Sequence, residues 1–462
     1  MNPKWISGSS RPAYERRWQK ALASMMAVWH RLSGDLRRDF DRCLENGVTA
    51  PHGSLLACVP ATAGVVIRPF RVPEPVWAVA GAVALVLVGL LPLADALNGM
   101  RKGLDVYLFL TGMMLTAELA RREGLFDYLA ALAVEHARGS PQRLFLLVYA
   151  VGILVTVLLS NDATAIVLTP AVYAATCAAG ARPLPYLFAC ALIANAASFV
   201  LPISNPANLV VFGERMPHLF EWLRQFTLPS IGSIVATYVV LRLTQARALA
   251  EETIERNVPK PRLGHGGKLT ALGIAAVGVA LLTASALDVQ LGLPTFVCGL
   301  VTAASVLALS RQSPWPVIRG VSWGVLPLVA GLFVMVEALA RTGAIAQLAA
   351  ILQGAVERSV RDAAWGAGIA TTIADNIANN LPVGLVAGSV AASDHLPAPV
   401  VNAMLIGVDL GPNLSVTGSL ATILWLVALR REKIEITAWR FLGIGLLVTP
   451  PALLVALAAA IH

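Results

Sequence analysis

The sequence has little charge for its length. Asp, Glu, Lys and Arg make up 13% of the 462 residues, whereas 57% of the residues are hydrophobic. Soluble domains typically carry about 25% charged residues, so this composition argues against a large soluble enzyme. Apolar runs near the ~20 residues that cross a bilayer recur along the chain. The composition therefore predicts an all-α polytopic membrane protein, with the lipid bilayer as its surroundings.

Motifs for catalysis or metal binding are also missing from the sequence. The chain has no CxxC pair, no Walker A pattern, no HExxH and no zinc-ligand cluster. His136, His265 and His395 lie near the ends of apolar segments. We therefore expect no metal, no cofactor and no ATP hydrolysis by this chain, and we expect that it is not an enzyme. Five cysteines are scattered along the chain and read as small apolar side chains: Cys43, Cys58, Cys177, Cys190 and Cys298.

The net charge of +8 does not indicate a nucleic-acid partner, because Arg and Lys lie mostly between apolar segments. In that position they act as topology signals and contact lipid headgroups. Charge and hydropathy divide the chain into four parts. We expect a polar basic N-terminal extension at 1–53 with no signal-peptide core, a first transmembrane repeat at 54–244, a polar central loop at 245–268 and a second repeat at 269–462.

Each repeat holds seven apolar segments in the same order. The first series is expected at 54–70, 76–95, 104–120, 143–160, 162–179, 185–212 and 226–244. The second is expected at 269–287, 291–309, 321–340, 360–378, 380–394, 398–428 and 437–461. Amphipathic stretches at 124–137 and 343–357 suit helices on the membrane surface, with a core-packing helix as the alternative.

Segments four and five of each half join at a short polar tip, and together they are too long for one crossing. We read each pair as a re-entrant helical hairpin, and segment six as a discontinuous helix. Each half then has five spans and one hairpin, ten spans in all. An odd number of spans places the second half upside down relative to the first, so the repeats are expected to be inverted.

Basic residues orient this arrangement. The central loop, the turn at 311–319 and the turn at 430–433 fall on one side and are basic, so that side is predicted to be cytoplasmic. Arg101 and Lys102 oppose this orientation, as does the N-terminal extension.

Four polar interruptions carry the candidate site. They are LLSNDATAIVLTP (158–170) and LPISNPANL (201–209) in the first half, and IADNIANNLP (373–382) and GVDLGPNLSVTGSLATILW (407–425) in the second. Polar groups inside lipid-length segments are expensive, and they are tolerated where broken helices line a polar cavity. Such elements in matching places of two halves indicate a secondary transporter with its site at the repeat interface.

Two intramembrane carboxylates stand out among these residues. Asp162 is able to hold a proton or help coordinate a cation, and burial favours its neutral form; it also suits a helix cap. Asp409 is by default a functional residue, and a carboxylate paired internally for packing is the alternative. The candidate solute-binding groups are Asn161, Ser204, Asn205, Asn208, Asn379, Asn380, Asn413, Thr417 and Ser419.

The four interruptions resemble those of the arsenite efflux permeases of the ArsB type, within the ion transporter superfamily. SNDATAIVLTP and IANNLPVGLVAG are similar to the two hairpin motifs, and GVDLGPNLSVTGSLATILWL is similar to the second broken helix. The resemblance covers residue 54 to the C-terminus. One departure is Asn413, where the family's DLGPK form has a lysine.

The resemblance implies export of arsenite and antimonite across the inner membrane, coupled to proton entry. Asp162 and Asp409 are then the expected proton carriers, and a soluble ATPase subunit is a possible partner. The alternative is a sodium/proton antiporter or a sodium-coupled dicarboxylate transporter on the same fold. The lack of an intramembrane Arg or Lys near the motifs disfavours a dicarboxylate carrier.

Overall fold

The protein is helical wherever it is described. The structure is a computed structural model that describes residues 73–251, 254–255, 262–287, 289–393 and 396–461, and these hold no β-strand. The predicted extension at 1–53 and the predicted first segment at 54–70 lie outside the described residues. The all-α class is thus confirmed for the described chain.

The helices of the first half follow the predicted order. They are α3 (Glu74–Leu87), α4 (Leu93–Lys102), α5 (Leu104–Arg122), α6 (Leu125–Ala137), α7 (Pro141–Leu158), η2 (Ala163–Leu168), α8 (Thr169–Ala178), α9 (Leu184–Ala196), η3 (Pro202–Ser204), α10 (Pro206–Phe212), η4 (Gly213–Arg215), α11 (Leu219–Thr244) and α12 (Ala246–Ala250). Here η2 is a π-helical turn, and η3 and η4 are 3₁₀ turns.

The second half repeats this order. Its helices are α13 (His265–Ala286), α14 (Gly292–Ser310), α15 (Trp315–Gly320), α16 (Val325–Arg341), α17 (Ala344–Arg358), α18 (Val360–Ala378), α19 (Asn380–Ser393), α20 (Ala398–Leu410), the 3₁₀ turn η5 (Gly411–Asn413), α21 (Leu420–Arg431) and α22 (Ala438–Ile461).

Matching helices begin with the same local chemistry in both halves. Ser140 caps α7 by accepting a hydrogen bond from the Arg143 N–H (3.3 Å), and Ser359 caps α18 in the same way (3.2 Å). Glycines with positive φ precede α6 and α17. The breaks between α9 and α10 and between α20 and α21 cover 197–205 and 411–419, nine residues in each.

One predicted span is wrong. The segment expected at 76–95 is two helices, α3 and α4, because α3 ends before Gly89, which has φ of 78°, and Pro92 precedes the new helix. The prediction also missed the short helices α12 and α15.

Length and hydropathy do not establish the predicted number of ten spans. Five described helices are long and apolar enough to cross a membrane: α7, α11, α13, α14 and α22. Up to seven qualify if the bent pairs α4–α5 (48°) and α16–α17 (72°) each count as one span. The shorter apolar helices are α3, η2 with α8, α9 and α19, most of them hairpin arms or halves of broken helices. A membrane-crossing segment that is broken into two short helices is therefore not recognised as a span by its helix length.

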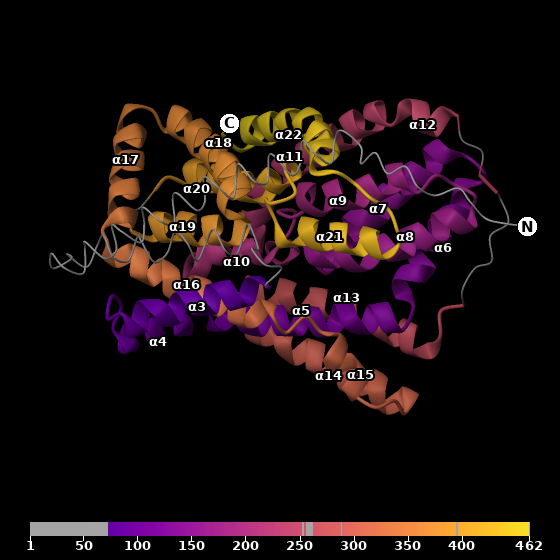
Figure 1. Cartoon of the computed structure of the whole chain (residues 1–462), viewed down its shortest axis with the longest axis horizontal. Helices are drawn as coiled ribbons and strands as arrows, with labels where there is room; N and C mark the ends of the chain where they lie inside the picture. The colour runs from indigo at the N-terminus through magenta and orange to yellow at the C-terminus, as the bar shows by residue number, and fades with distance from the viewer. Residues whose placement is uncertain (1–72, 252–253, 256–261, 288, 394–395, 462) are drawn as a thin grey trace, which may run out of the picture.

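The helices are arranged in layers (Figure 1). α11 and α22 pack together along one long edge, while α5 with α14 and α3 with α16 pack along the opposite region. The hairpins and the broken helices occupy the space between them. This middle layer is where the polar interruptions meet.

The first tip reverses the chain. The Thr164 hydroxyl lies 2.8 Å from the Thr156 hydroxyl and 3.5 Å from the carbonyl oxygen of Gly152. A continuous helix would place residues 152 and 164 about 18 Å apart. The second pair reverses likewise, because α17 leads into α18 and also packs against the returning α19, as α6 packs against α7 and α8.

The two amphipathic predictions have different outcomes. α6 packs into the core with seven buried residues, which favours the core-packing alternative. In α17 only Ile345 and Ala349 are buried, so one face of that helix is largely exposed.

Polar contacts connect the basic turns to neighbouring helix ends. Arg122 donates to the carbonyl oxygen of Pro316 in the turn at 311–319. Arg182 pairs with Glu251, at 3.8 Å, next to the central loop. At the opposite end Lys102 pairs with Glu337 (2.6 Å) and Arg341 pairs with Asp95. The first hairpin starts at the end with α6 and α12, and the second starts at the end with α4 and α17 (Figure 1).

Candidate functional site

The four interruptions meet around one small space, which we call the central cavity. It measures about 20 Å³, enough for roughly one water molecule. Its polar lining residues are Asn161, Asp162, Asn205, Asn380 and Ser419, so each interruption contributes at least one side chain. No Lys, Arg or His lies among the residues that line it.

Helix N-termini surround this cavity. Asn161 and Asp162 precede η2, Asn205 and Ser419 are the N-cap residues of α10 and α21, and Asn380 is the first residue of α19. The Asn205 amide oxygen accepts from the Ala207 N–H (3.0 Å), and the Ser419 hydroxyl accepts from the Thr422 N–H (3.4 Å). The positive ends of these helix dipoles therefore lie at the cavity and favour solute oxygen atoms there.

A large cavity adjoins the central one. It measures about 700 Å³ and shares Leu110, Asp162, Pro206, Val325 and Leu420 with the central cavity. Its remaining lining includes Arg121 and Asp127, and also Arg431 and Glu432 from the turn at 430–433. Asp162, which is partly exposed, therefore lies where the central cavity meets the large cavity.

Asp409 connects to the central cavity through one amide. Asp409 is fully buried near the end of α20, and its Oδ1 accepts from Asn205 Nδ2 at 2.7 Å. Because Asn205 also lines the cavity, a change in the charge of Asp409 acts directly on a cavity wall.

The second tip is tied to the second break. Asn379 has φ of 73° and ψ of 152°, a region that residues other than glycine seldom adopt. Its side-chain amide donates to the carbonyl oxygen of Thr417 (3.3 Å), and the Asn380 N–H donates to that of Gly418 (2.9 Å). The Thr417 hydroxyl in turn donates to the carbonyl oxygen of Asn376 (3.0 Å). The tip and the break thus form one unit.

Five of the nine predicted solute-binding residues do not line the central cavity. Ser204 donates to the carbonyl oxygen of Val157 (3.3 Å), joining the first break to the first hairpin. Asn208 donates to the carbonyl oxygens of Ser198 (2.9 Å) and Leu201 (3.2 Å) inside its own break. Asn379 lines a separate space of about 10 Å³ beside the central cavity. The other two are Asn413 and Thr417, both bonded within the protein.

Asn413 forms hydrogen bonds between the two broken helices that the sequence did not reveal. Its amide oxygen accepts from Asn195 Nδ2 (2.9 Å), and its own Nδ2 donates to the carbonyl oxygen of Leu192 (3.0 Å). Asn195 holds the same place in α9 as Asp409 in α20, one residue before the helix ends. This matching position is the feature of the sequence from which Asn195 could have been predicted as a functional residue.

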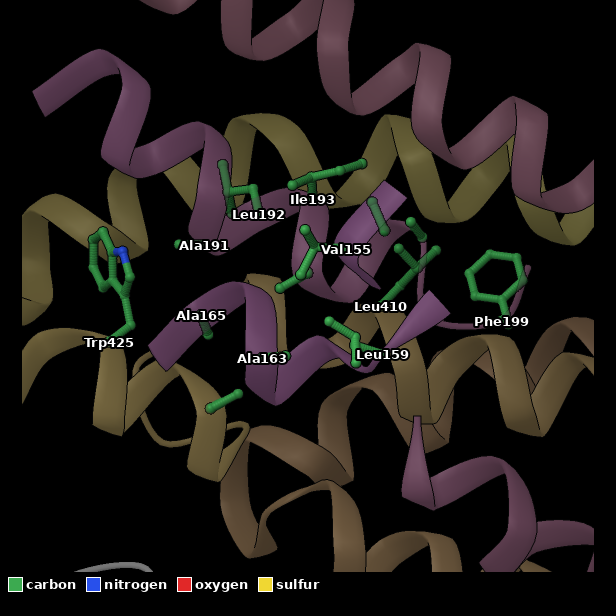
Figure 2. Packing of buried hydrophobic residues seen from close by; sticks show 14 of the residues in the cluster. Val155, Leu159, Ala163, Ala165, Ala191, Leu192, Ile193, Phe199, Leu410 and Trp425 are labelled. Atoms are coloured by element: carbon green, nitrogen blue, oxygen red, sulfur yellow. The ribbon is translucent and has the colours of Figure 1, made fainter. Parts of the chain in front are cut away.

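Apolar packing supports these polar ties. One cluster of buried residues, drawn in Figure 2, includes Val155 of α7, Leu159 just after that helix, Ala163 and Ala165 of η2, Leu410 of α20 and Trp425 of α21. The described part of the chain contains Cys177, Cys190 and Cys298, and none of the three lines the central or the large cavity.

Comparison with known proteins agrees with this architecture. The CitMHS family, described as citrate transporters, matches residues 63–407. The chain belongs to this family. It is therefore a membrane transporter with several apolar helices, and the expected place in the superfamily of the arsenite permeases is confirmed.

The chain is also similar to an arsenical pump membrane protein of Escherichia coli, to which it is 26% identical over 74% of this chain and 82% of that protein. An uncharacterized transporter of Mycobacterium tuberculosis is 28% identical over 86% of this chain and 94% of its own length.

The fold is that of a solved transporter. The crystal structure of the Alcanivorax borkumensis YdaH transporter, described as having an unusual topology, aligns with a TM-score of 0.56 over 89% of this chain and 97% of that one. At 15% identity this likeness concerns the fold alone.

Proposed function

We propose that this protein exports arsenite and antimonite from the cytoplasm, coupled to proton entry. The observation that carries the proposal is the central cavity, where one carboxylate, three amides and one hydroxyl from the four interruptions meet. Similarity to an arsenical pump membrane protein supports the same solute.

The lining suits a neutral trihydroxy arsenic species. Such a solute needs hydrogen-bond donors and acceptors more than it needs fixed charge, and amides and hydroxyls provide both. Cysteine thiolates would hold trivalent arsenic too tightly for turnover, and none of the three cysteines in the described residues lines the cavity. Asn161, Asn205, Asn380 and Ser419 are the proposed binding groups, and Ser204, Asn208, Asn379, Asn413 and Thr417 position them.

Proton coupling is assigned to two carboxylates. Asp162 lies where the central and large cavities adjoin, so it is accessible to both solute and water. Asp409 reaches the solute through Asn205. In this scheme the two carboxylates are deprotonated toward the cytoplasm and protonated from the other side in each cycle.

We further propose inverted repeats and an inner-membrane location. The two hairpins start at opposite ends of the molecule, which supports an inverted arrangement (Figure 1). The rim of the large cavity includes the basic turn at 430–433, so that cavity faces the cytoplasm in the predicted orientation. Alternating access then moves the hairpins against the helices that surround them.

Everted membrane vesicles test this function. Uptake of arsenite should rise when the interior is acidified, and a protonophore should abolish the increase. Asp162→Asn and Asp409→Asn should each reduce gradient-driven uptake at least tenfold while membrane insertion persists. Asp127→Asn, in the wall of the large cavity but away from the tips, is the matched control and should transport normally. Normal uptake by both tip variants would refute the proton assignment.

A sodium-coupled carrier of di- or tricarboxylates is the second candidate. The family description and the helix N-termini around the central cavity favour it, since both suit a carboxylate-bearing solute. Without a cationic side chain in the lining, that charge would rest on the dipoles and on bound sodium alone. Uptake of citrate or succinate that requires sodium, together with no response to arsenite, would select this function.

A further inference from the structure

A third buried carboxylate lies beside the site and has no role in the scheme above. Asp375 is in α18, one turn before the second tip, and it is fully buried. Neither of its carboxylate oxygens has a hydrogen-bond partner among the described residues. A Cβ atom at Gly411 would lie 2.6 Å from Asp375 Oδ2, so the carboxyl group points at the backbone where the second break begins.

Asp409 is the charged neighbour of Asp375. The Thr372 hydroxyl lies 3.4 Å from the carbonyl oxygen of Gly407, and Asn376 Nδ2 lies 3.0 Å from that of Gly411, so the two segments touch on both sides of the pair. Asp409 Oδ2 also lacks a partner in the described chain. The remaining charged groups on α18 and on the helices packed against it are exposed and belong to helix ends: Glu357, Arg358, Arg361, Asp362 and Arg440. α19 and η5 carry no titratable side chain.

Two ionised carboxylates in this environment would be strongly unfavourable. An isolated charge is costly to bury, and a second like charge beside it adds to that cost. The Asn205 amide donates to Asp409 Oδ1, and the Ser198 hydroxyl also interacts with Asp409. None of the described residues donates to Asp375. An electrically neutral or singly charged pair, with a proton on at least one carboxyl group, avoids this cost.

We propose that Asp375 and Asp409 form a shared proton site at the contact between the second hairpin and the second broken helix. The proton bridges the unpartnered oxygens, so one carboxyl donates and the other accepts. Losing it leaves two like charges between α18 and α20 and favours their separation. This inference rests on the proposed proton coupling, and it assigns part of that coupling to Asp375.

The pair is placed to communicate with the solute. Asn205 binds Asp409 on one side and lines the central cavity on the other. Asp375 lies on the arm that carries Asn379 and Asn380 at its tip. Protonation of the pair therefore acts on both second-half interruptions and on one wall of the cavity.

Infrared spectroscopy of the purified protein tests the site without any substrate. A carboxylic C=O band from a buried protonated group should be present at neutral pH and disappear as the pH is raised. Asp375→Asn should shift or remove this band. Asp362→Asn, in the exposed first turn of the same helix, should leave it unchanged. A wild-type spectrum with no such band, or a band that Asp375→Asn does not alter, would overturn the proposal.

Proteoliposomes test the coupling role. Protons moved per arsenite, measured with an internal pH dye, should fall in Asp375→Asn, while arsenite exchange without a gradient stays within about threefold of wild type. The same ratio and pH profile as wild type would overturn the role of Asp375. If wild-type protein moves no arsenite, the proposed function fails, and the infrared result still decides whether the shared proton site exists.

Discussion

The side chain of Asn205 has two structural roles. Its amide oxygen caps α10, and its amide nitrogen holds Asp409 at 2.7 Å. The sequence placed Asn205 in a broken helix and marked it as a solute ligand, but it did not reveal the bond to Asp409, 204 residues away. Long-range pairs of this kind depend on how the halves pack, which no local pattern records.

Substitution of Asn205 separates the helix cap from the bond to Asp409. In Asn205→Ser a hydroxyl still caps α10, but the bond to Asp409 is lost, so we expect weakened proton coupling while the stability that comes from the cap is kept. Asn205→Ala loses the cap as well and should be less stable than Asn205→Ser by about 1 kcal/mol. Thermal unfolding in detergent and gradient-driven uptake measure the two effects. Equal stability of both variants would contradict the capping role.

At the scale of elements, the helix boundaries were largely predictable and the broken segments were predictable in kind. Polar runs such as SNPAN interrupt apolar periodicity, so the tips and breaks are visible in the sequence. The split between α3 and α4 was missed because Leu87–Leu91 stays apolar and only Gly89 and Pro92 mark the turn. The positive φ of Asn379 could not be predicted either. Asn161 occupies the matching place at the first tip and has no positive φ, so the tip sequence alone does not indicate this backbone conformation.

Close packing of α18 on α20 holds the second hairpin to the second broken helix. A Cβ at Gly407 would lie 2.1 Å from Thr371 Oγ1 and 2.4 Å from the carbonyl oxygen of Gly368. Gly407→Ala should therefore separate the helices, destabilise the protein by roughly 1–3 kcal/mol and impair transport. Gly366→Ala is the matched control on α18, because a Cβ there meets nothing within 4 Å. Similar unfolding temperatures for the two variants would argue against tight packing at Gly407.

At the scale of the whole molecule, the ends of the protein differ in access to the site. The large cavity joins the central cavity to the end that carries Arg121 and Arg431. Charge predicts that the basic turns share an end, since each lies next to an apolar segment of spanning length. It could not predict that the cavity opens between α5, η2 and α21, because that depends on the tilt of helices around the first tip.

Accessibility from each side tests this picture. In a variant with all five cysteines replaced by alanine, Ala428→Cys in the wall of the large cavity should react with a membrane-impermeant thiol reagent in everted vesicles. It should react at least tenfold more slowly in right-side-out vesicles. Leu97→Cys, exposed on α4 at the opposite end, should show the reverse preference. Because solute and lining compete for the same space, saturating arsenite should slow labelling of Ala428→Cys and leave Leu97→Cys unaffected. Equal labelling of Ala428→Cys from both sides would mean that the large cavity is not a one-sided entrance to the site.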